Sequence, residues 1–147
     1  MVKIYLDTCS IQRPLDTLSQ TRLRLEAEAI LGVLAEVKAG NIELISSTVL
    51  ELETLRNPLA IRREHGEQVL AEATTIVLID EQIEQRSKQF MEMGVKSMDA
   101  LHLAAAEIAR ADYFCTCDDR FLRRAKFIAD LQTVVVTPLE LIEVIDK

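Results

Sequence analysis

The chain has 147 residues, of which 49% are hydrophobic, and this is enough for one globular domain that buries most of its apolar surface without help. Its formal net charge of -7 excludes a protein that coats nucleic acid non-specifically, because such binding depends on neutralising phosphates. The charge does not exclude a nuclease, since a site made of carboxylates is itself negative and metal ions offset the repulsion. We therefore expect one domain over residues 1–147.

The chain carries no signal for a membrane or a secreted location. No apolar run is long enough to cross a bilayer, and Asp7 interrupts the first segment too early for a signal peptide. Cys9, Cys115 and Cys117 form an odd set that suits reduced thiols better than a disulfide framework. The Cys115-x-Cys117 pair lacks a second Cys or His pair, so we do not expect a zinc site. We expect a cytoplasmic protein with no membrane partner.

Strands and helices are predicted to alternate along the whole chain. Short β-branched and aromatic runs indicate strands, and an apolar period of 3.6 residues indicates helices. In chain order the predicted elements are a strand at 2–6, a loop at 9–18, a helix at 19–39, a strand at 41–46, helices at 48–57 and 60–73, a strand at 75–79, a helix at 81–93, a helix that begins at Ser97, a strand at 112–116, a helix at 120–128, a strand at 133–136 and a helix at 139–145.

Helix caps support several of these boundaries. Ser47, Asp80 and Ser97 are typical N-cap residues, and the run from Thr137 to Glu140 has the pattern of a capping box. The alternation predicts an α/β fold, a sandwich with a central, mainly parallel sheet of about five strands and helices on both faces. In such sheets ligands bind outside the carboxyl ends of the strands.

Four acids are candidates for one site. Asp7 and Asp118 follow two predicted strands, and Asp99 lies in the first turn of the helix that Ser97 begins. Glu51 and Glu53 lie on the helix at 48–57 but about 200° apart around it, so only one can face a given cleft. Each acid also has a simpler explanation as a helix cap, a turn residue or a solvated charge, and spacing alone does not prove that the four converge.

Convergence of these acids would require a cation. Two carboxylates about 4 Å apart repel by roughly 4 kcal/mol at an effective dielectric constant of about 20. Oxygen ligands without a thiolate or imidazole cluster select Mg²⁺ or Mn²⁺ over zinc. Such ions activate a water molecule and stabilise the charge that develops in phosphodiester cleavage.

Several short motifs, in this order along the chain, resemble the PIN-domain family, and in particular its VapC-like members. The motifs are Asp7-Thr8 after a strand, an acid in the helix after the second strand, the run Met98-Asp99-Ala100-Leu101-His102-Leu103-Ala104, and Thr116-x-Asp118-x-x-Phe121. The resemblance implies a metal-dependent endoribonuclease that cleaves single-stranded RNA with Mg²⁺ or Mn²⁺. Among small bacterial members it also implies the toxin of a toxin–antitoxin pair, with a small antitoxin as partner and a homodimer permitted.

The resemblance implies Asp7, Asp99 and Asp118 as metal ligands, and an acid on the second helix as a further catalytic residue. We prefer Glu53 to Glu51 because Glu53 stands in the Glu-x-x-Arg-Asn-Pro run of one subgroup. The chain departs from the family pattern after Thr8, where many members have Asn or Ser and this chain has Cys9. We expect Ser10 to take over that polar role.

Other polar residues have supporting roles in this hypothesis. Thr8 and Thr116 are candidate positioning hydroxyls beside catalytic acids, although local backbone bonding explains them equally well. We expect His102 to be a packed histidine, since a metal-dependent nuclease needs no histidine base, and His65 to lie on the surface.

Two basic groups flank the acids in the sequence and are a candidate rim that binds RNA phosphates. Arg123 and Arg124 are the pair whose replacement by Gln would test this hypothesis. They comprise Arg13, Arg56, Arg62 and Arg63, and Arg120, Arg123, Arg124 and Lys126. Solvated helix faces explain these charges equally well. The alternative function is a PIN-like binding or scaffold module without activity, which the acidic charge and Cys9 favour and which the four retained acids oppose.

Overall fold

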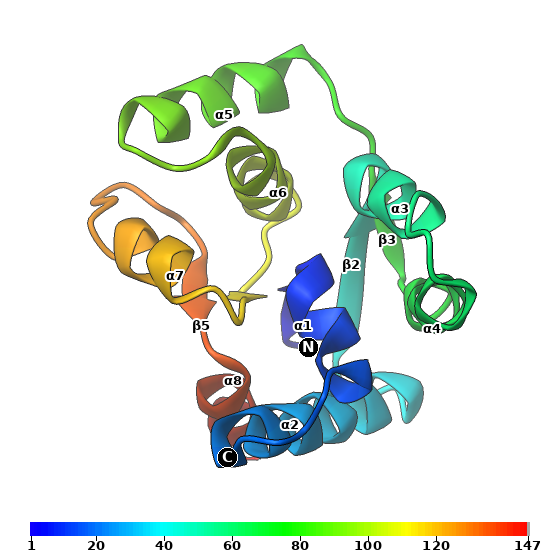
Figure 1. The fold of residues 1–147 in the computed structure, drawn as a ribbon. Coiled ribbons are helices and arrows are strands. Elements are labelled where there is room, and N and C mark those ends of the chain that lie inside the picture. Colours follow the sequence, from blue (N-terminus) through cyan, green and yellow to red (C-terminus); the bar gives the residue numbers. More distant parts are fainter. Residues whose placement is uncertain (147) are drawn as a thin grey trace.

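Five parallel strands form the centre of the molecule, in a computed structural model that describes residues 1–146 (Figure 1). The strands are β1 (Lys3–Leu6), β2 (Glu43–Ser47), β3 (Thr75–Val77), β4 (Tyr113–Cys115) and β5 (Val134–Val136). Their order across the sheet is β3-β2-β1-β4-β5, and all four neighbouring pairs are parallel. The predicted five-stranded parallel sheet is confirmed.

Helices cover both faces of this sheet. They are α1 (Thr8–Gln12), the 3₁₀ helix η1 (Arg13–Leu15), α2 (Thr21–Lys38), α3 (Thr48–Leu55), α4 (Ala60–Leu70), α5 (Glu81–Glu92), α6 (Ser97–Ile108), α7 (Asp119–Ala125) and α8 (Pro138–Ile145). Figure 1 shows α5 and α6 together on one side and α2 and α8 together on the other. The predicted sandwich is therefore confirmed. Within residues 1–146, no helix combines the length and the apolar character needed to span a membrane.

The core is built around β1, the middle strand. Ile4, Tyr5 and Leu6 are fully buried, as are Phe114 and Cys115 of the neighbouring β4. A strand that is covered on both faces needs apolar residues on both, which explains why the β1 sequence does not alternate with polar residues. The amphipathic α2 contributes Ile30 and Val33 to the opposite side of this core, whereas Leu31 of the same helix is 53% exposed.

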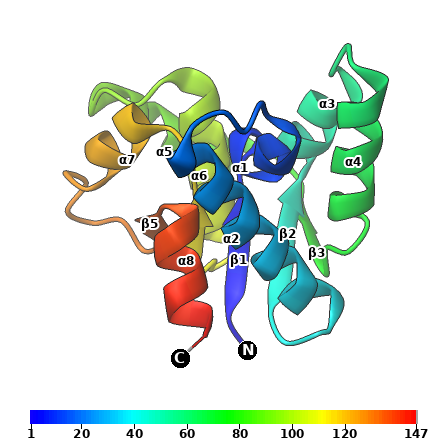
Figure 2. The ribbon, with the colours of Figure 1, turned by 60° about the horizontal axis from the view of Figure 1, so that its bottom comes forward.

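The strand order creates a crevice between β1 and β4. The chain first runs outward through β2 and β3, then crosses to β4 and β5 on the other side of β1. At such a reversal the connections after the two strands leave on opposite faces, so a crevice opens beyond their carboxyl ends. The main chains remain joined there, since Asp7 N donates to Cys115 O at 3.2 Å. Figure 2 shows α1 at this edge, and the N-terminus and the end of α8 at the other.

Two local predictions were wrong. The region at 9–18, predicted as a loop, contains α1 and η1, because Asp7 caps a helical turn by accepting a hydrogen bond from Ser10 N at 3.0 Å. Ser97 is the first residue of α6 and not its N-cap, which is Lys96 without a side-chain bond. Caps at Ser47 and Asp80 and the capping box of α8 are confirmed.

Candidate active site

Asp7 is fixed at the end of β1. Its Oδ1 accepts hydrogen bonds from Ser10 N and from the Cys9 thiol, both at 3.0 Å. Burial raises the pKa of Asp7, and hydrogen bonds from Thr116, Cys9 and Ser10 offset part of this rise. The carboxylate is therefore a rigid group whose negative charge is costly to maintain without a further cation.

Asp99 extends from the first turn of α6 towards the same crevice. Burial raises its pKa, and the negative charges of Asp7 and Asp118 raise it further, against the opposing effect of His102 and Lys96. The charges of two aspartates that lie far from it in the sequence thus act on Asp99. Within residues 1–146, the Asp99 carboxylate accepts no hydrogen bond, which leaves both of its oxygens available.

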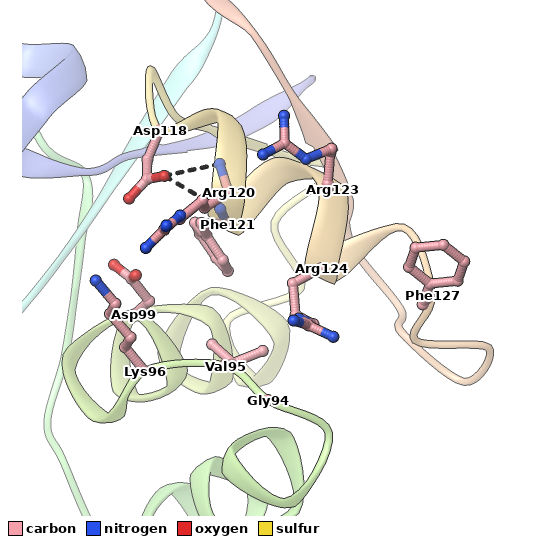
Figure 3. A pocket seen from close by; sticks show the side chains of 10 residues that line it. All are labelled: Gly94, Val95, Lys96, Asp99, Asp118, Arg120, Phe121, Arg123, Arg124 and Phe127. Carbon is pink, nitrogen blue, oxygen red and sulfur yellow. Dashed lines mark hydrogen bonds between the residues drawn. The ribbon is translucent and has the colours of Figure 1, made fainter.

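Asp118 and Asp119 have different partners although they are adjacent. Asp118 caps α7, because its Oδ1 accepts from Arg120 N at 2.9 Å and from Phe121 N at 3.2 Å (Figure 3). Asp119 accepts two hydrogen bonds from Arg22, at 2.6 and 2.9 Å, and these hold the pKa of Asp119 below its usual value. Asp118 is therefore a helix cap, which was the simpler explanation offered for this acid. Its Oδ2 is nevertheless free to face the cavity that Asp99 also lines.

Glu53 joins three elements. Its Oε1 accepts a hydrogen bond from Thr8 of α1 at 2.9 Å and lies 2.5 Å from His102 Nε2 of α6. Burial alone would raise the pKa of Glu53, but the hydrogen bond and charge of His102 and the hydrogen bond from Thr8 outweigh burial and lower it. Glu51 instead accepts from Ser46 Oγ at 2.9 Å.

Both histidines are engaged. His102 is 3% exposed and packed, as predicted, with its Nδ1 2.6 Å from Tyr5 Oη. His65 was predicted to lie on the surface, but it is half-buried and its Nε2 lies 2.8 Å from Ile11 O. That prediction was wrong because α4 packs against α1, an element that the sequence did not reveal.

The polar role expected of Ser10 stays a prediction, and its side chain helps to lower the pKa of Asp7 by hydrogen bonding. Its hydroxyl is buried and donates to Cys115 O at 3.1 Å, so the side chain faces the sheet. Cys9 itself contacts Asp7, as a thiol donor. Thr116 Oγ1 accepts from Asp118 N at 3.0 Å, and therefore orients the loop that carries this acid.

A cavity of about 490 Å³ opens beside Asp99 and Asp118 (Figure 3). Lys96 also lines it, as do Arg120, Arg123 and Arg124, so three of the four cations of the second basic group lie next to two of the acids. In the first basic group, two of the four arginines are taken up by ion pairs. Arg13 binds Asp16 at 2.7 Å, and Arg62 binds Asp16 at 2.8 Å.

The sequence analysis missed a buried acid behind the site. Glu26 of α2 is 1% exposed and lies 3.3 Å from Arg13 and 3.6 Å from Arg22. Arg22 also binds Asp119, so these contacts tie α2 to the start of α7 and support the position of Asp118. The helical spacing could have revealed that Glu26 is buried, because Glu26 precedes Ile30 by four residues and falls on the buried face of the helix.

The donor set fits a hard divalent cation. Asp7, Asp99 and Asp118 offer only oxygen ligands, their charges oppose one another, and oxygens of Asp99 and Asp118 are free of hydrogen bonds. In the described part of the chain, no three His, Cys, Asp or Glu side chains are gathered closely enough to hold a metal ion as they stand. The fit therefore rests on the chemistry of the donors.

The fold and the acidic crevice define an α/β/α protein with the features of a nuclease. The model of the PIN domain matches residues 4–127, and the chain belongs to this family, whose members are generally nucleases. The resemblance noted in the sequence is thereby confirmed. A comparison with curated proteins found no match.

Two solved structures share the fold. The structure of FitAB bound to an IR36 DNA fragment aligns with a TM-score of 0.58 and 18% identity, over 92% of this chain and 94% of that chain. VapBC2 from Rickettsia felis, bound to a DNA fragment from their promoter, aligns with a TM-score of 0.61 and 12% identity, over 92% of this chain and 98% of that chain. At these identities the similarity supports the fold.

Proposed function

We propose that the protein is a Mg²⁺- or Mn²⁺-dependent endoribonuclease that cleaves single-stranded RNA by hydrolysis. The observation that carries the proposal is the electrostatic coupling of Asp99 to Asp7 and Asp118 at the carboxyl edge of a parallel sheet. Asp7, Asp99 and Asp118 are the residues that would hold the cation. When bound, a divalent cation supplies water activation and neutralises charge on the phosphate.

Glu53 has a separate role in this proposal. Its lowered pKa keeps the carboxylate ionised at neutral pH, and Thr8 and His102 occupy only Oε1. Oε2 therefore remains to orient the attacking water and accept its proton. His102 is a positioning residue, since its Nε2–H donates to Glu53. Thr116 is also a positioning residue, because it orients the loop that carries Asp118.

We propose that the protein is the toxin of a toxin–antitoxin pair, in the cytoplasm, and that a small antitoxin binds it. Support comes from exposed hydrophobic side chains on α3, on α4 and in the turn that joins them: Leu52, Leu55, Leu59 and Ile61, between 44% and 73% exposed. The names of the two solved structures, VapBC2 and FitAB, both bound to DNA, agree with a complex of this kind. A homodimer through exposed apolar side chains is the second proposed assembly, and light scattering of the isolated chain tests it.

The first test is cleavage of a mixed single-stranded RNA pool with Mn²⁺, Mg²⁺ or a chelator. We compare the wild type with Asp7→Asn and Asp99→Asn, each purified from a nuclease-deficient host. Asp80→Asn is the matched control, because Asp80 caps α5 away from the site and Asn also caps helices. Metal-dependent cleavage that both site variants lose and the control keeps is the expected result.

The competing proposal is a PIN-like module that binds without cleaving, favoured by the net charge of -7 and by Cys9 at a position where many members have Asn or Ser. A wild type that cleaves no RNA under any metal condition would support this alternative. Thermal melting then adds information, because a ligand that binds only the folded state must raise the melting temperature. A melting temperature of the wild type that does not rise with Mn²⁺ would exclude a metal-dependent function.

A further inference from the structure

One aromatic side chain differs from the others in its exposure. Phe127, just after α7, is 84% exposed, whereas Phe90, Phe114 and Phe121 are at most 4% exposed. Phe127 lines the same cavity as Asp99 and Asp118, and in Figure 3 it stands at the end of that cavity away from the two acids. Exposure of a single apolar side chain is common, but an exposed ring at the rim of a cavity is positioned to contact whatever binds in that cavity.

The cavity between Phe127 and the acids is lined with free positive charge. Within residues 1–146, Lys96, Arg120, Arg123 and Arg124 form no ion pair, whereas Arg13, Arg22, Arg62 and Arg86 do. Figure 3 shows Lys96 and Arg120 directed towards the acids, and Arg124 between these groups and Phe127. The cavity is therefore acidic at one end, basic along its length and aromatic at the other end.

The Arg124 side chain lies against Gly94. A Cβ atom on Gly94 would lie 3.1 Å from Arg124 Nε and 3.2 Å from its Cζ, so the guanidinium group rests against the bare main chain. Gly94 also has a φ of 94°, which glycine adopts without strain as the chain leaves α5. The absence of a side chain at this position thus serves both the turn and the approach of Arg124.

We propose that Phe127 and Arg124 form a nucleotide subsite for the single-stranded RNA substrate, with one base stacked on the Phe127 ring and a neighbouring phosphate bound by Arg124. This inference rests on the proposed ribonuclease function. Single-stranded nucleic acids bind along grooves that combine backbone cations with an aromatic platform, and stacking accepts any base. A negative polymer matches the four free cations, which explains how a chain of net charge -7 holds RNA at an acidic site.

The test measures binding and cleavage separately. Binding of a short single-stranded RNA that contains the fluorescent base 2-aminopurine is measured in chelator, and cleavage of the same RNA is measured with Mn²⁺. We compare the wild type with Phe127→Ala, Phe127→Leu and Phe127→Tyr. The matched control is Leu78→Ala, which removes a 70% exposed apolar side chain that does not line the cavity.

Phe127→Ala and Phe127→Leu are expected to weaken RNA binding by about 5- to 100-fold and to lose the quenching of 2-aminopurine that stacking causes. Phe127→Tyr and Leu78→Ala are expected to bind as the wild type does. Arg124→Gln is expected to flatten the dependence of log affinity on log salt by about 0.7, the value for one phosphate contact on a single strand.

Two failures are distinguishable. Wild-type-like RNA affinity in Phe127→Ala, together with metal-dependent cleavage, overturns the subsite and leaves the ribonuclease intact; if Phe127→Ala then releases a bound protein partner, the ring is a protein contact. Phe127-dependent RNA binding without cleavage under any metal condition keeps the subsite and overturns the ribonuclease.

Discussion

Glu53 Oε1 lies 2.5 Å from His102 Nε2, and this contact joins α3 to α6 at the edge of the acidic crevice. An ionised carboxylate only accepts hydrogen bonds, so Nε2 carries the proton. The other ring nitrogen of His102, Nδ1, lies 2.6 Å from Tyr5 Oη, and Tyr5 Oη lies 2.7 Å from Ser47 Oγ. A relay of hydrogen bonds therefore runs from the sheet to Glu53, and Glu51 has no part in it.

This relay predicts which glutamate supports cleavage. Glu53→Gln removes the carboxylate that accepts the proton of the attacking water, and we expect it to lower the cleavage rate by about 100- to 10,000-fold, the usual contribution of a positioned general base. Glu51→Gln is the matched control and is expected to stay near the wild-type rate, because Glu51 bonds only to Ser46. Initial rates with Mn²⁺ measure both; a larger loss in Glu51→Gln would reassign the second acid.

The same contact predicts an acid-dependent stability difference. The pKa of Glu53 is lowered from 4.5, with burial opposed by the bonds to His102 and Thr8. A carboxylate whose pKa falls on folding stabilises the native state above its unfolded pKa, and this contribution is lost as the pH falls through the folded value. We expect the wild type to melt above Glu53→Gln at pH 7 and the gap to close below pH 4.5, measured by thermal melts from pH 3 to 7. A gap that widens in acid would contradict the lowered pKa.

For Asp99 we predict the opposite dependence of stability on pH. Its pKa is raised by burial and by the charges of Asp7 and Asp118, so the ionised form strains the folded state at neutral pH. A carboxyl group with a raised pKa contributes stability below its unfolded pKa and loses it as the pH rises through the folded value. Asp99→Asn is therefore expected to raise the melting temperature at pH 7 without added metal, and this gain should vanish as the pH falls towards 3.8.

The metal supplies the control for that prediction. Excess Mg²⁺ should stabilise the wild type more than Asp99→Asn and shrink the gain, because it binds the three carboxylates only in the folded state. Asp80→Asn, outside the site, should show neither the gain nor the change with metal. Destabilisation of Asp99→Asn in chelator would mean that the acids do not repel one another.

Most of the fold was predictable because its signals are local. Apolar periods and caps at Ser47, Asp80 and Thr137 give the alternation, and alternation fixes a parallel sheet with its ligand edge. The short α1 was missed because a five-residue helix carries no period, and it depends on the Asp7 cap. Ser97 was misassigned because a serine suits an N-cap and the first helical position alike.

The acids of the site were predictable as positions at strand ends and in a first helical turn, but their partners were not. Nothing local in the sequence pairs Glu53 with His102, which lies 49 residues away, or Arg22 with Asp119, which lies 97 residues away. Phe127 was equally hidden, because its exposure depends on how α7 ends. Such relationships arise from tertiary packing between residues far apart in the chain. The local patterns of a single sequence do not show them.

Cys9 gives a prediction about a departure from the family pattern. Its thiol donates to Asp7 Oδ1 at 3.0 Å, so a donor is present although Asn or Ser is absent. Cys9→Ser keeps a donor and is expected to cleave at close to the wild-type rate, whereas Cys9→Ala leaves Asp7 with fewer bonds and is expected to lose about 10-fold. Initial rates at equal folded fraction measure both; equal rates in the two variants would show that this bond does not orient Asp7.

The contact between α3 and α4 predicts that replacing a helical glycine by alanine destabilises the fold here, although this substitution is usually stabilising. Glycine within a helix normally costs about 0.5–1 kcal/mol relative to alanine, so Gly→Ala is commonly stabilising. At Gly66 a Cβ would lie 2.7 Å from Thr54 Cγ2 and 3.3 Å from Gln12 Nε2, and Thr54 is 4% exposed. Overpacking of this kind costs about 1–3 kcal/mol, so Gly66→Ala is expected to destabilise the fold in urea denaturation.

A second substitution separates this clash from a general effect of alanine. Thr54→Ser removes the Cγ2 atom, so the double variant Gly66→Ala with Thr54→Ser should recover most of the free energy of unfolding that Gly66→Ala loses, and Thr54→Ser alone is the control. Because α3 carries Glu53, Gly66→Ala is also expected to lower the cleavage rate, and the double variant to restore it. A more stable Gly66→Ala would show that α3 and α4 pack less closely than the 2.7 Å approach implies.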